Sequence, residues 1–182
     1  MDKRIEKTMD KLSRALLNLC CRKDLKNITV IELCAEAHIN KSTFYLHFKS
    51  MDECLEAIPS FVARRILEVE NNEKLSEESK NRIIENLLDF IEENRDICTQ
   101  FYNSEHYASA TFILKKSIVA EISKRRHFSK TENHALYVAI YAIVATVLDT
   151  FFYCAQFNDR EKEKQHLQNA FNCFVPLADF FE

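Results

Sequence analysis

The feature that most constrains this chain is the absence of glycine from all 182 residues. Tight turns between β-strands use positive-φ backbone conformations, which glycine adopts at little cost. The chain also has only two prolines, and long stretches are rich in Leu, Ile, Ala, Glu and Lys. The sequence therefore predicts an all-α protein, and the spacing of its apolar residues divides it into about nine helices.

The absence of glycine also excludes several classes of enzyme. Without glycine the chain has no P-loop, no dinucleotide-binding fingerprint and no GxSxG elbow. Its six histidines show no HExxH or other metal-ligand spacing. We therefore expect a non-enzymatic protein without a cofactor or a bound metal.

Charge is distributed unevenly along the chain. Residues 1–50 hold ten Lys or Arg against six Asp or Glu, whereas the remainder holds fifteen against twenty-two. A basic segment on an acidic body suits a protein that touches phosphate groups at one end only, although ordinary scatter of charge would also explain the difference.

The cysteines and the N-terminus bear on the cellular compartment. Seven cysteines form no CxxC motif, and several fall at apolar helical positions. This pattern indicates small core residues in a reducing cytosol, and a redox-sensing thiol is the alternative. The first residues contain no apolar signal-peptide core, which predicts a cytoplasmic protein.

Residues 28–49 predict two short helices joined by a tight turn. Thr29 and Glu32 have the spacing of a capping box, which would begin the first helix. His38 and Ile39 then form the turn, and Asn40 can cap a second helix over residues 41–47. Apolar anchors four residues apart, Phe44 and Phe48, would hold the inner face of that second helix.

This segment resembles the helix-turn-helix of the TetR family of bacterial transcriptional regulators. The matching residues are Thr29-Val30, Leu33-Cys34, Ala37, Ile39 and Thr43-Phe44-Tyr45-x-His47-Phe48-Lys49. The resemblance departs from the family at His38, where a glycine is usual, and at Leu46, where a polar residue is common. We expect a positive φ at His38, which histidine tolerates better than most residues. Leu46 could contact a thymine methyl group or pack on sugar.

The resemblance and the chemistry of these side chains imply a set of DNA-binding residues. Tyr45, His47 and Lys49 resemble the phosphate clamp of the family, and Lys41 and its two neighbours begin the helix that would reach base edges. The full set is Thr29, His38, Lys41, Ser42, Thr43, Tyr45, His47 and Lys49.

We expect three units along the chain. Residues 1–50 would form a three-helix, DNA-binding head, with a first helix over residues 3–21. A connecting helix over residues 51–70 contains Pro59, which should kink or break it and could mark a pivot or a plain bend. Residues 71–182 would form a helical effector-binding and dimerisation domain, beginning at the polar stretch 71–78.

Residues 135–157 are apolar on nearly all sides. Their length would suit a membrane span, but the segment contains Asp149 and no second such segment exists, so a buried helix that needs a partner subunit is the better interpretation. Asp149 could pair across a dimer, meet a cationic ligand or reach solvent. Regulators of this family dimerise through their last two long helices, which predicts interface residues Tyr141, Leu148, Phe152, Phe171 and Phe174.

The aromatic residues of the body predict walls for a ligand pocket, namely Phe90, Phe101, Tyr102, Phe112 and Tyr137. The resemblance therefore implies a homodimeric repressor. It would bind a near-palindromic double-stranded operator and would be released by a small apolar or amphipathic effector. The alternative is a helix-turn-helix protein regulated by a protein partner, without a small-molecule pocket.

Overall fold

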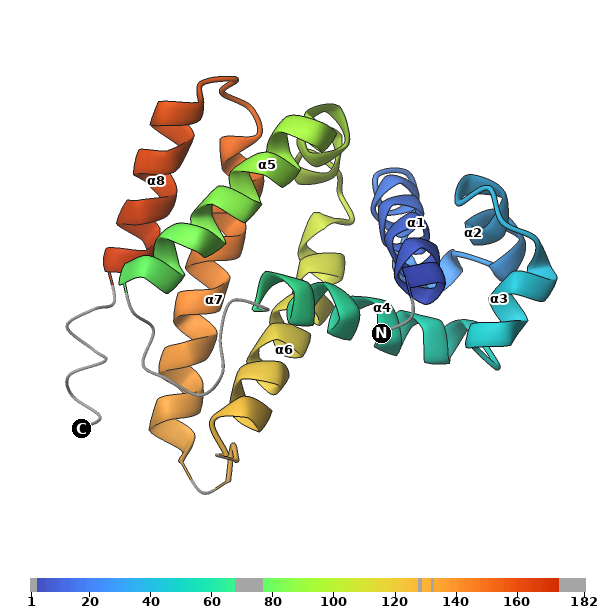
Figure 1. Ribbon diagram of the computed structural model, residues 1–182, viewed down its shortest axis with the longest axis horizontal. Coiled ribbons are helices and arrows are strands. Elements are labelled where there is room, and N and C mark those ends of the chain that lie inside the picture. The colour runs from blue at the N-terminus through green and yellow to red at the C-terminus, as the bar shows by residue number, and fades with distance from the viewer. Residues whose placement is uncertain (1–2, 68–76, 128, 132, 174–182) are drawn as a thin grey trace.

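The computed structural model describes residues 3–67, 77–127, 129–131 and 133–173, and all regular structure within these ranges is helical. The elements in chain order are α1 (Lys3–Cys20), the short 3-10 helix η1 (Leu25–Asn27), α2 (Val30–Glu36), α3 (Lys41–His47), α4 (Met51–Ile66), α5 (Glu77–Tyr102), α6 (Tyr107–Arg125), α7 (His134–Cys154) and α8 (Arg160–Asn172). Helices α1 to α3 form a head at one end of the molecule, and α4 runs from the head to the bundle of α5 to α8 (Figure 1).

The all-α prediction is confirmed, but the number of helices differs. Over the described ranges there are eight α-helices rather than about nine. Element α5 consists of two helical stretches that meet at a kink, where Asn94 leaves the helical region (φ −134°, ψ 24°). At this kink the Asn94 side chain donates to the carbonyl of Phe90 at 2.9 Å.

Helix α2 begins at the predicted capping box. The Thr29 hydroxyl accepts from the backbone N–H of Glu32, whose carboxylate accepts from the backbone N–H of Thr29 at 2.9 Å. The start of α4, at Ser50, has a related arrangement. Ser50 accepts from the N–H of Glu53 at 3.2 Å, but the Glu53 carboxylate accepts from the N–H of Lys49 instead of that of Ser50. Both arrangements satisfy backbone donors that a helix start leaves unpaired.

Pro59 does not break α4. The helix continues from Met51 to Ile66 with Pro59 buried inside it. A proline costs one backbone hydrogen bond, and burial of Ile58, Phe61 and Ala63 on the inner face of α4 compensates. Of the two predicted outcomes, a kink or a break, the break does not occur.

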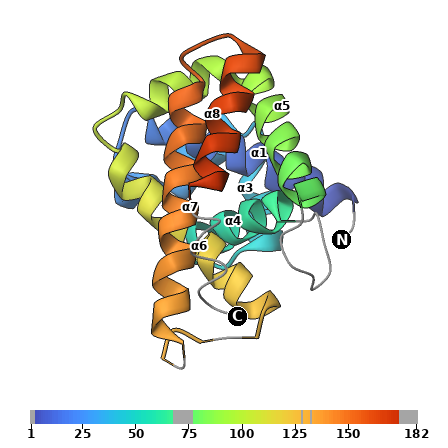
Figure 2. The ribbon, with the colours of Figure 1, turned by 90° about the vertical axis from the view of Figure 1, so that its left-hand side faces the viewer.

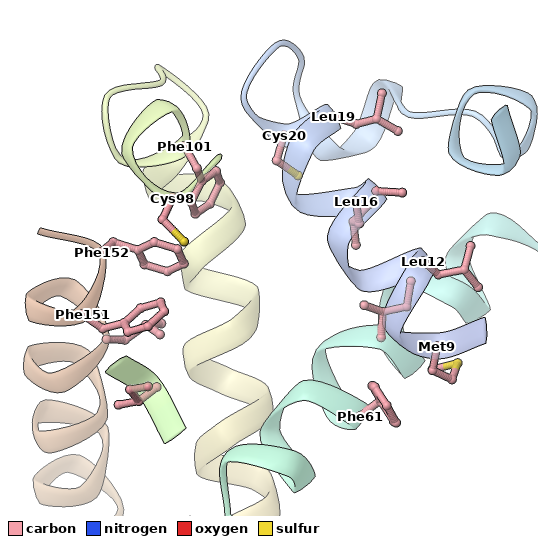
Figure 3. Close-up of a cluster of buried hydrophobic side chains, with 14 of the residues drawn as sticks. Met9, Leu12, Leu16, Leu19, Cys20, Phe61, Cys98, Phe101, Phe151 and Phe152 are labelled. Atoms are coloured by element: carbon pink, nitrogen blue, oxygen red, sulfur yellow. The ribbon is translucent and has the colours of Figure 1, made fainter. Parts of the chain in front are cut away.

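One continuous apolar core joins the head to the bundle. It contains Leu12 and Leu16 of α1, Leu33 and Phe44 of α2 and α3, and reaches Phe152 of α7. Part of it is drawn in Figure 3. A smaller cluster around Val119 lies at the other end of α4 and α6. Since α1 packs on α2 and also contacts α4 and α5, the head has no core of its own.

A buried ion pair ties α5 to α8. The side chain of Glu163 is fully buried, and Arg95 donates to it at 2.8 Å and to the carbonyl of Ala155 at 3.0 Å. The backbone N–H of Asp159 also donates to Glu163 at 3.1 Å. These contacts surround both charges with hydrogen-bond partners, which buried charges require.

Replacing Glu163 with alanine should therefore leave the Arg95 guanidinium partly buried without its counter-ion. We expect a loss of about 3 kcal/mol in the free energy of unfolding, measured by urea denaturation. The control is Glu161→Ala on the exposed side of the same helix, which should change stability little. Equal losses in the two variants would contradict the structural role of the buried pair.

The capping box predicts a specific pH dependence. Hydrogen bonds from Lys23, at 2.8 Å, and from Thr29 lower the pKa of Glu32 from 4.5 to about 2. Because the folded pKa lies below the unfolded value, this stabilisation is complete above about pH 4.5 and is lost as the pH falls toward 2.

Thermal unfolding of the wild type and of Glu32→Gln from pH 6 to pH 2 tests this dependence. The amide keeps a capping group but loses the charge that pairs with Lys23. The wild type should be the more stable protein at pH 6, and the difference should shrink toward zero near pH 2. A difference that stays constant with pH would show that the ionised carboxylate has no such role.

Candidate nucleic-acid interface and ligand cleft

The turn between α2 and α3 is a Schellman motif built on histidine. His38 has φ 51°, as expected at this position. Its N–H donates to the carbonyl of Ala35 at 3.2 Å, and the N–H of Ile39 donates to the carbonyl of Cys34 at 3.0 Å. This pair of hydrogen bonds ends α2 and sets the direction of α3. Asn40 precedes α3 but makes no side-chain cap to it.

The inner face of α3 is anchored by two aromatic rings. Phe44 is fully buried and Phe48 is buried beside it, with ring centroids 5.3 Å apart. Both rings belong to the core that contains Leu12 of α1 and Leu33 of α2. The outer face of α3 is therefore held in one orientation.

The predicted DNA-binding residues lie on α3, directly before and after it in the sequence, and at the start of α2. Most of them are exposed, and the remaining two are half-buried. The exposed ones are Thr29, His38, Lys41, Ser42, Tyr45 and Lys49, and the half-buried ones are Thr43 and His47. Tyr45 is 57% exposed, and its ring meets the ring of Phe44 edge-on at 5.4 Å, which directs the phenol outward.

The Thr29 hydroxyl is already occupied. It donates to the Glu32 carboxylate at 2.7 Å while accepting from the backbone of the same residue. A hydroxyl carries a single hydrogen to donate. A direct hydrogen bond from Thr29 to a phosphate would therefore compete with the capping box.

Two ammonium groups near α3 are available for an anion. Lys41 and Lys49 have no ion-pair partner within the described ranges, whereas Arg22 pairs with Glu36 at 2.9 Å and Lys23 with Glu32 at 2.8 Å. The internal pairs neutralise the acidic side chains of α2. The net positive charge of this surface therefore lies at the two ends of α3.

Two apolar side chains of α2 and α3 are also exposed. Leu46 is 82% exposed and Ile31 is 61% exposed. Leu46 departs from the family pattern in the sequence, whereas the exposure of Ile31 was not predicted. Ile31 lies off the face of α2 formed by Leu33 and Cys34, so the helical spacing could have indicated its exposure.

A cleft of about 630 Å³ lies between the head and the bundle. Of the five predicted pocket residues, Phe90 and Phe101 line it. Tyr102 instead meets the ring of Tyr107 edge-on and that of Tyr153 at a tilt. Phe112 is 52% exposed, and Tyr137 packs in the smaller cluster around Val119. The structure thus brings two of the five together.

The other walls of the cleft come from residues that were not predicted to line a pocket. They include Leu16 and Leu17 of α1, Ile58, Phe61, Val62 and Ile66 of α4, Ile113 and Leu114 of α6, and Phe151 and Phe152 of α7. Helical periodicity showed that these residues face inward but not which neighbour they face.

The predicted interface residues lie mostly inside the protomer. Leu148, Phe152 and Phe171 are buried in its own core, so they offer a partner little surface. Tyr141 is half-buried, and Phe174 lies outside the described residues. The more exposed residues of α7, such as Val138 and Tyr153, lie away from this buried face.

Asp149 on α7 is paired within its own chain. It accepts from the Tyr107 hydroxyl at 2.6 Å and from the Lys115 ammonium at 2.8 Å. Burial and the neighbouring carboxylate raise the pKa of Tyr107 far above its usual range, so the phenol remains a donor. The charge on α7 therefore has a partner without a ligand or a second subunit.

The cysteines are mainly core residues. Burial raises the pKa of the thiols of Cys20, Cys54, Cys98 and Cys154 to about 12, which suppresses the reactive thiolate. Among the described residues, no three His, Cys, Asp or Glu side chains lie close enough together to hold a metal ion.

Helix α7 is long and apolar enough by composition to cross a membrane, with a mean hydropathy of 1.9. Only 22% of its most apolar window is buried in the protomer. Its ion pair with Lys115 and its place beside α8 in the bundle (Figure 2) indicate a helix of a packed bundle whose outer side is uncovered in one protomer.

The similarity of this chain to a known family covers most of the head and the first half of α4. A family model described as bacterial regulatory proteins of the tetR family matches residues 14–58. A solved structure, described as a tetR-family transcriptional regulator from Streptomyces coelicolor, is 13% identical, with a TM-score of 0.48 over 97% of this chain and 84% of that chain. No curated protein matches. The matched segment contains all of α2, the Schellman turn and α3, so the helix-turn-helix of this chain is similar to that of the tetR family of bacterial regulatory proteins.

Proposed function

We propose that the chain is a homodimeric repressor that reads a near-palindromic operator and releases it on binding a small-molecule effector. The observation that carries this proposal is the fixed, polar outer face of α3, held by the buried rings of Phe44 and Phe48. A helix in this setting can enter the major groove.

The side chains around α3 divide by position into two roles. Lys41, Ser42 and Thr43 form its first turn, where recognition helices contact base edges. Tyr45, His47 and Lys49 follow toward its end and are placed to bind phosphate oxygens. His38 acts through the Schellman turn, which positions the start of α3, and Thr29 acts mainly through its cap.

Two copies of the chain are needed to read a palindrome, and the outer face of α7 is the best candidate for their contact. A helix that is apolar on all sides is normally covered on all sides. The outer side of α7 carries small or apolar residues such as Ala135, Val138, Ala142 and Tyr153. The exposed side of α8 is polar, with Glu161, Lys162, Gln165 and Asn169, so α7 would form the centre of the interface.

The cleft supports a ligand-gated repressor over the alternative, a helix-turn-helix protein regulated only through a protein partner. A filled interior would have favoured the alternative. An effector needs only to bind the DNA-released state better than the bound state, and a hundredfold preference corresponds to about 2.7 kcal/mol. Such a protein would act in the cytoplasm, with residues 1–50 as head, 51–70 as connector and 71–182 as effector-binding and dimerisation domain.

Replacing Tyr45 with alanine tests the role of α3. Hydrogen bonds to charged groups contribute about 1.5–3 kcal/mol, so affinity for a duplex selected by the wild-type protein should fall at least about tenfold. Electrophoretic mobility shift measures the affinity. The melting temperature should change little because Tyr45 is 57% exposed.

Two further variants complete this test. Tyr45→Phe keeps the ring on Phe44 and removes only the hydroxyl, so it should lose most of the same affinity. Phe112→Ala removes a similarly exposed ring, 52% exposed, from α6 outside the head and should bind DNA as the wild type does. Unchanged binding by Tyr45→Ala would remove this residue from the interface.

Replacing Val138 with aspartate tests the dimer. The side chain is 51% exposed in the protomer, so the fold should persist, whereas a charge within an apolar interface should separate the subunits. Sedimentation should show a dimer for the wild type and monomers for Val138→Asp. The control is Gln165→Asp on the polar side of α8. An undisturbed dimer in Val138→Asp would exclude this face of α7.

A further inference from the structure

Leu46 is the most exposed large apolar side chain in the part of the chain that the structure describes. It is 82% exposed, against 61% for Ile31, the next in order. Exposure alone says little, because single apolar side chains are common on protein surfaces. The position of Leu46 is more informative, since it lies on α3, at the end of the molecule opposite α8 (Figure 1).

Leu46 lies on the side of α3 that faces away from the core. Successive residues of an α-helix are about 100° apart around its axis, so residues two positions before or after Phe44 lie about 160° from it. These residues are Ser42 and Leu46, and both are exposed, whereas Phe44 is fully buried. Ser42 and Leu46 therefore form the outermost stripe of the helix, which a recognition helix directs toward the base edges.

The surroundings of Leu46 on α3 suit a nucleic acid. Helix α3 contains no acidic residue. The ammonium groups of Lys41 and Lys49, which have no ion-pair partner within the described ranges, lie near its two ends. Such cations suit the phosphate groups along a groove. Leu46 is thus an apolar side chain between two cations, on a surface without a carboxylate of its own.

The chemistry of the major groove limits what Leu46 can contact there. A leucine side chain neither donates nor accepts a hydrogen bond, so it cannot replace the hydration of the nitrogen and oxygen atoms on the base edges. The apolar group that a base pair presents in the major groove is the C5 methyl of thymine. Cytosine carries the same group when it is methylated at C5. Contact between leucine and this methyl removes apolar surface of both from water.

We propose that Leu46 is a specificity-determining residue that contacts the C5 methyl group of a pyrimidine, which in unmodified DNA is thymine. This inference rests on the proposed function, because it requires α3 to lie in the major groove of an operator. It selects the methyl contact over packing on sugar. It also implies that one position in each half-site is recognised by an apolar contact, so that 5-methylcytosine satisfies Leu46 there as thymine does.

The test removes the methyl group from the DNA. A duplex selected by the wild-type protein is prepared with deoxyuridine in place of each thymidine in turn, which deletes the C5 methyl and keeps O4. At one thymine of a half-site the wild type should bind about fourfold more weakly by electrophoretic mobility shift, the loss expected when one methyl group is no longer buried. Binding that is insensitive to uracil at every thymine would overturn the methyl contact and leave packing on sugar.

Protein variants assign the effect to Leu46. Because this side chain is 82% exposed, Leu46→Ala should fold, which circular dichroism verifies, and it should bind the thymine and uracil duplexes equally. Leu46→Met keeps an apolar side chain of similar size and should keep most of the preference for thymine. The matched control is Ile31→Ala, which removes an exposed apolar side chain from α2 and should leave that preference unchanged. A preference for thymine that persists in Leu46→Ala would overturn the assignment.

The source of the methyl group is tested at the same position. When the critical T·A pair is replaced, a pair with 5-methylcytosine should bind the wild type about fourfold better than the pair with cytosine, because only the methyl group differs. Leu46→Ala should not distinguish the two. Equal binding of both duplexes by the wild type would show that the thymine is recognised through another atom, and would overturn the proposal.

Salt dependence separates this contact from the phosphate contacts. Lys49→Ala should lower the slope of log affinity against log salt concentration by about one, whereas Leu46→Ala should leave the slope unchanged. A lower slope in Leu46→Ala would contradict an apolar contact. If the wild type selects no duplex, the proposed function fails and this inference fails with it. A duplex that is bound without dependence on any methyl group overturns this inference alone.

Discussion

The structure of the head depends on the packing of Phe44 and Phe48 against α1 and α2. Helix α3 has only seven residues, and an isolated helix of that length is unstable in water because nucleation costs more than a few hydrogen bonds return. Its stability comes from the burial of these two rings and from the Schellman turn at His38. The same contacts determine which side of α3 faces solvent, so the recognition surface follows directly from the core.

That core continues into the body. Helix α1 places Leu12 against the helix-turn-helix and Leu16 both in the core and on the wall of the cleft. The ion pairs of Asp10 and Arg14 then attach α1 to α4 and α5 at the surface. Exposed ion pairs contribute little stability, so the apolar contacts of α1 dominate its position, and these are the contacts that an occupant of the cleft would change.

Structural features that depend on residues close together in the sequence could be predicted, whereas features that depend on distant residues could not. The cap formed by Thr29 and Glu32 and the positive φ of His38 depend on residues a few positions apart, and both were predicted. The ion pair of Asp149 with Lys115 and the burial of Phe152 depend on which helices become neighbours. Apolar periodicity identifies the inner face of a helix but not the helix that covers it, which is why Phe152, predicted at a subunit interface, lines the cleft instead.

The contacts that Asp149 makes within its own chain limit the kinds of partner that can cover α7. Because Lys115 and Tyr107 already neutralise and hydrogen-bond the carboxylate, the outer side of this helix does not require a cationic ligand or an ion pair from a second subunit. What remains uncovered is mainly small and apolar, and small side chains allow two helices to approach closely. The remaining requirement of α7 is therefore burial of apolar surface, which a second copy of the same helix would provide by symmetry in the proposed dimer.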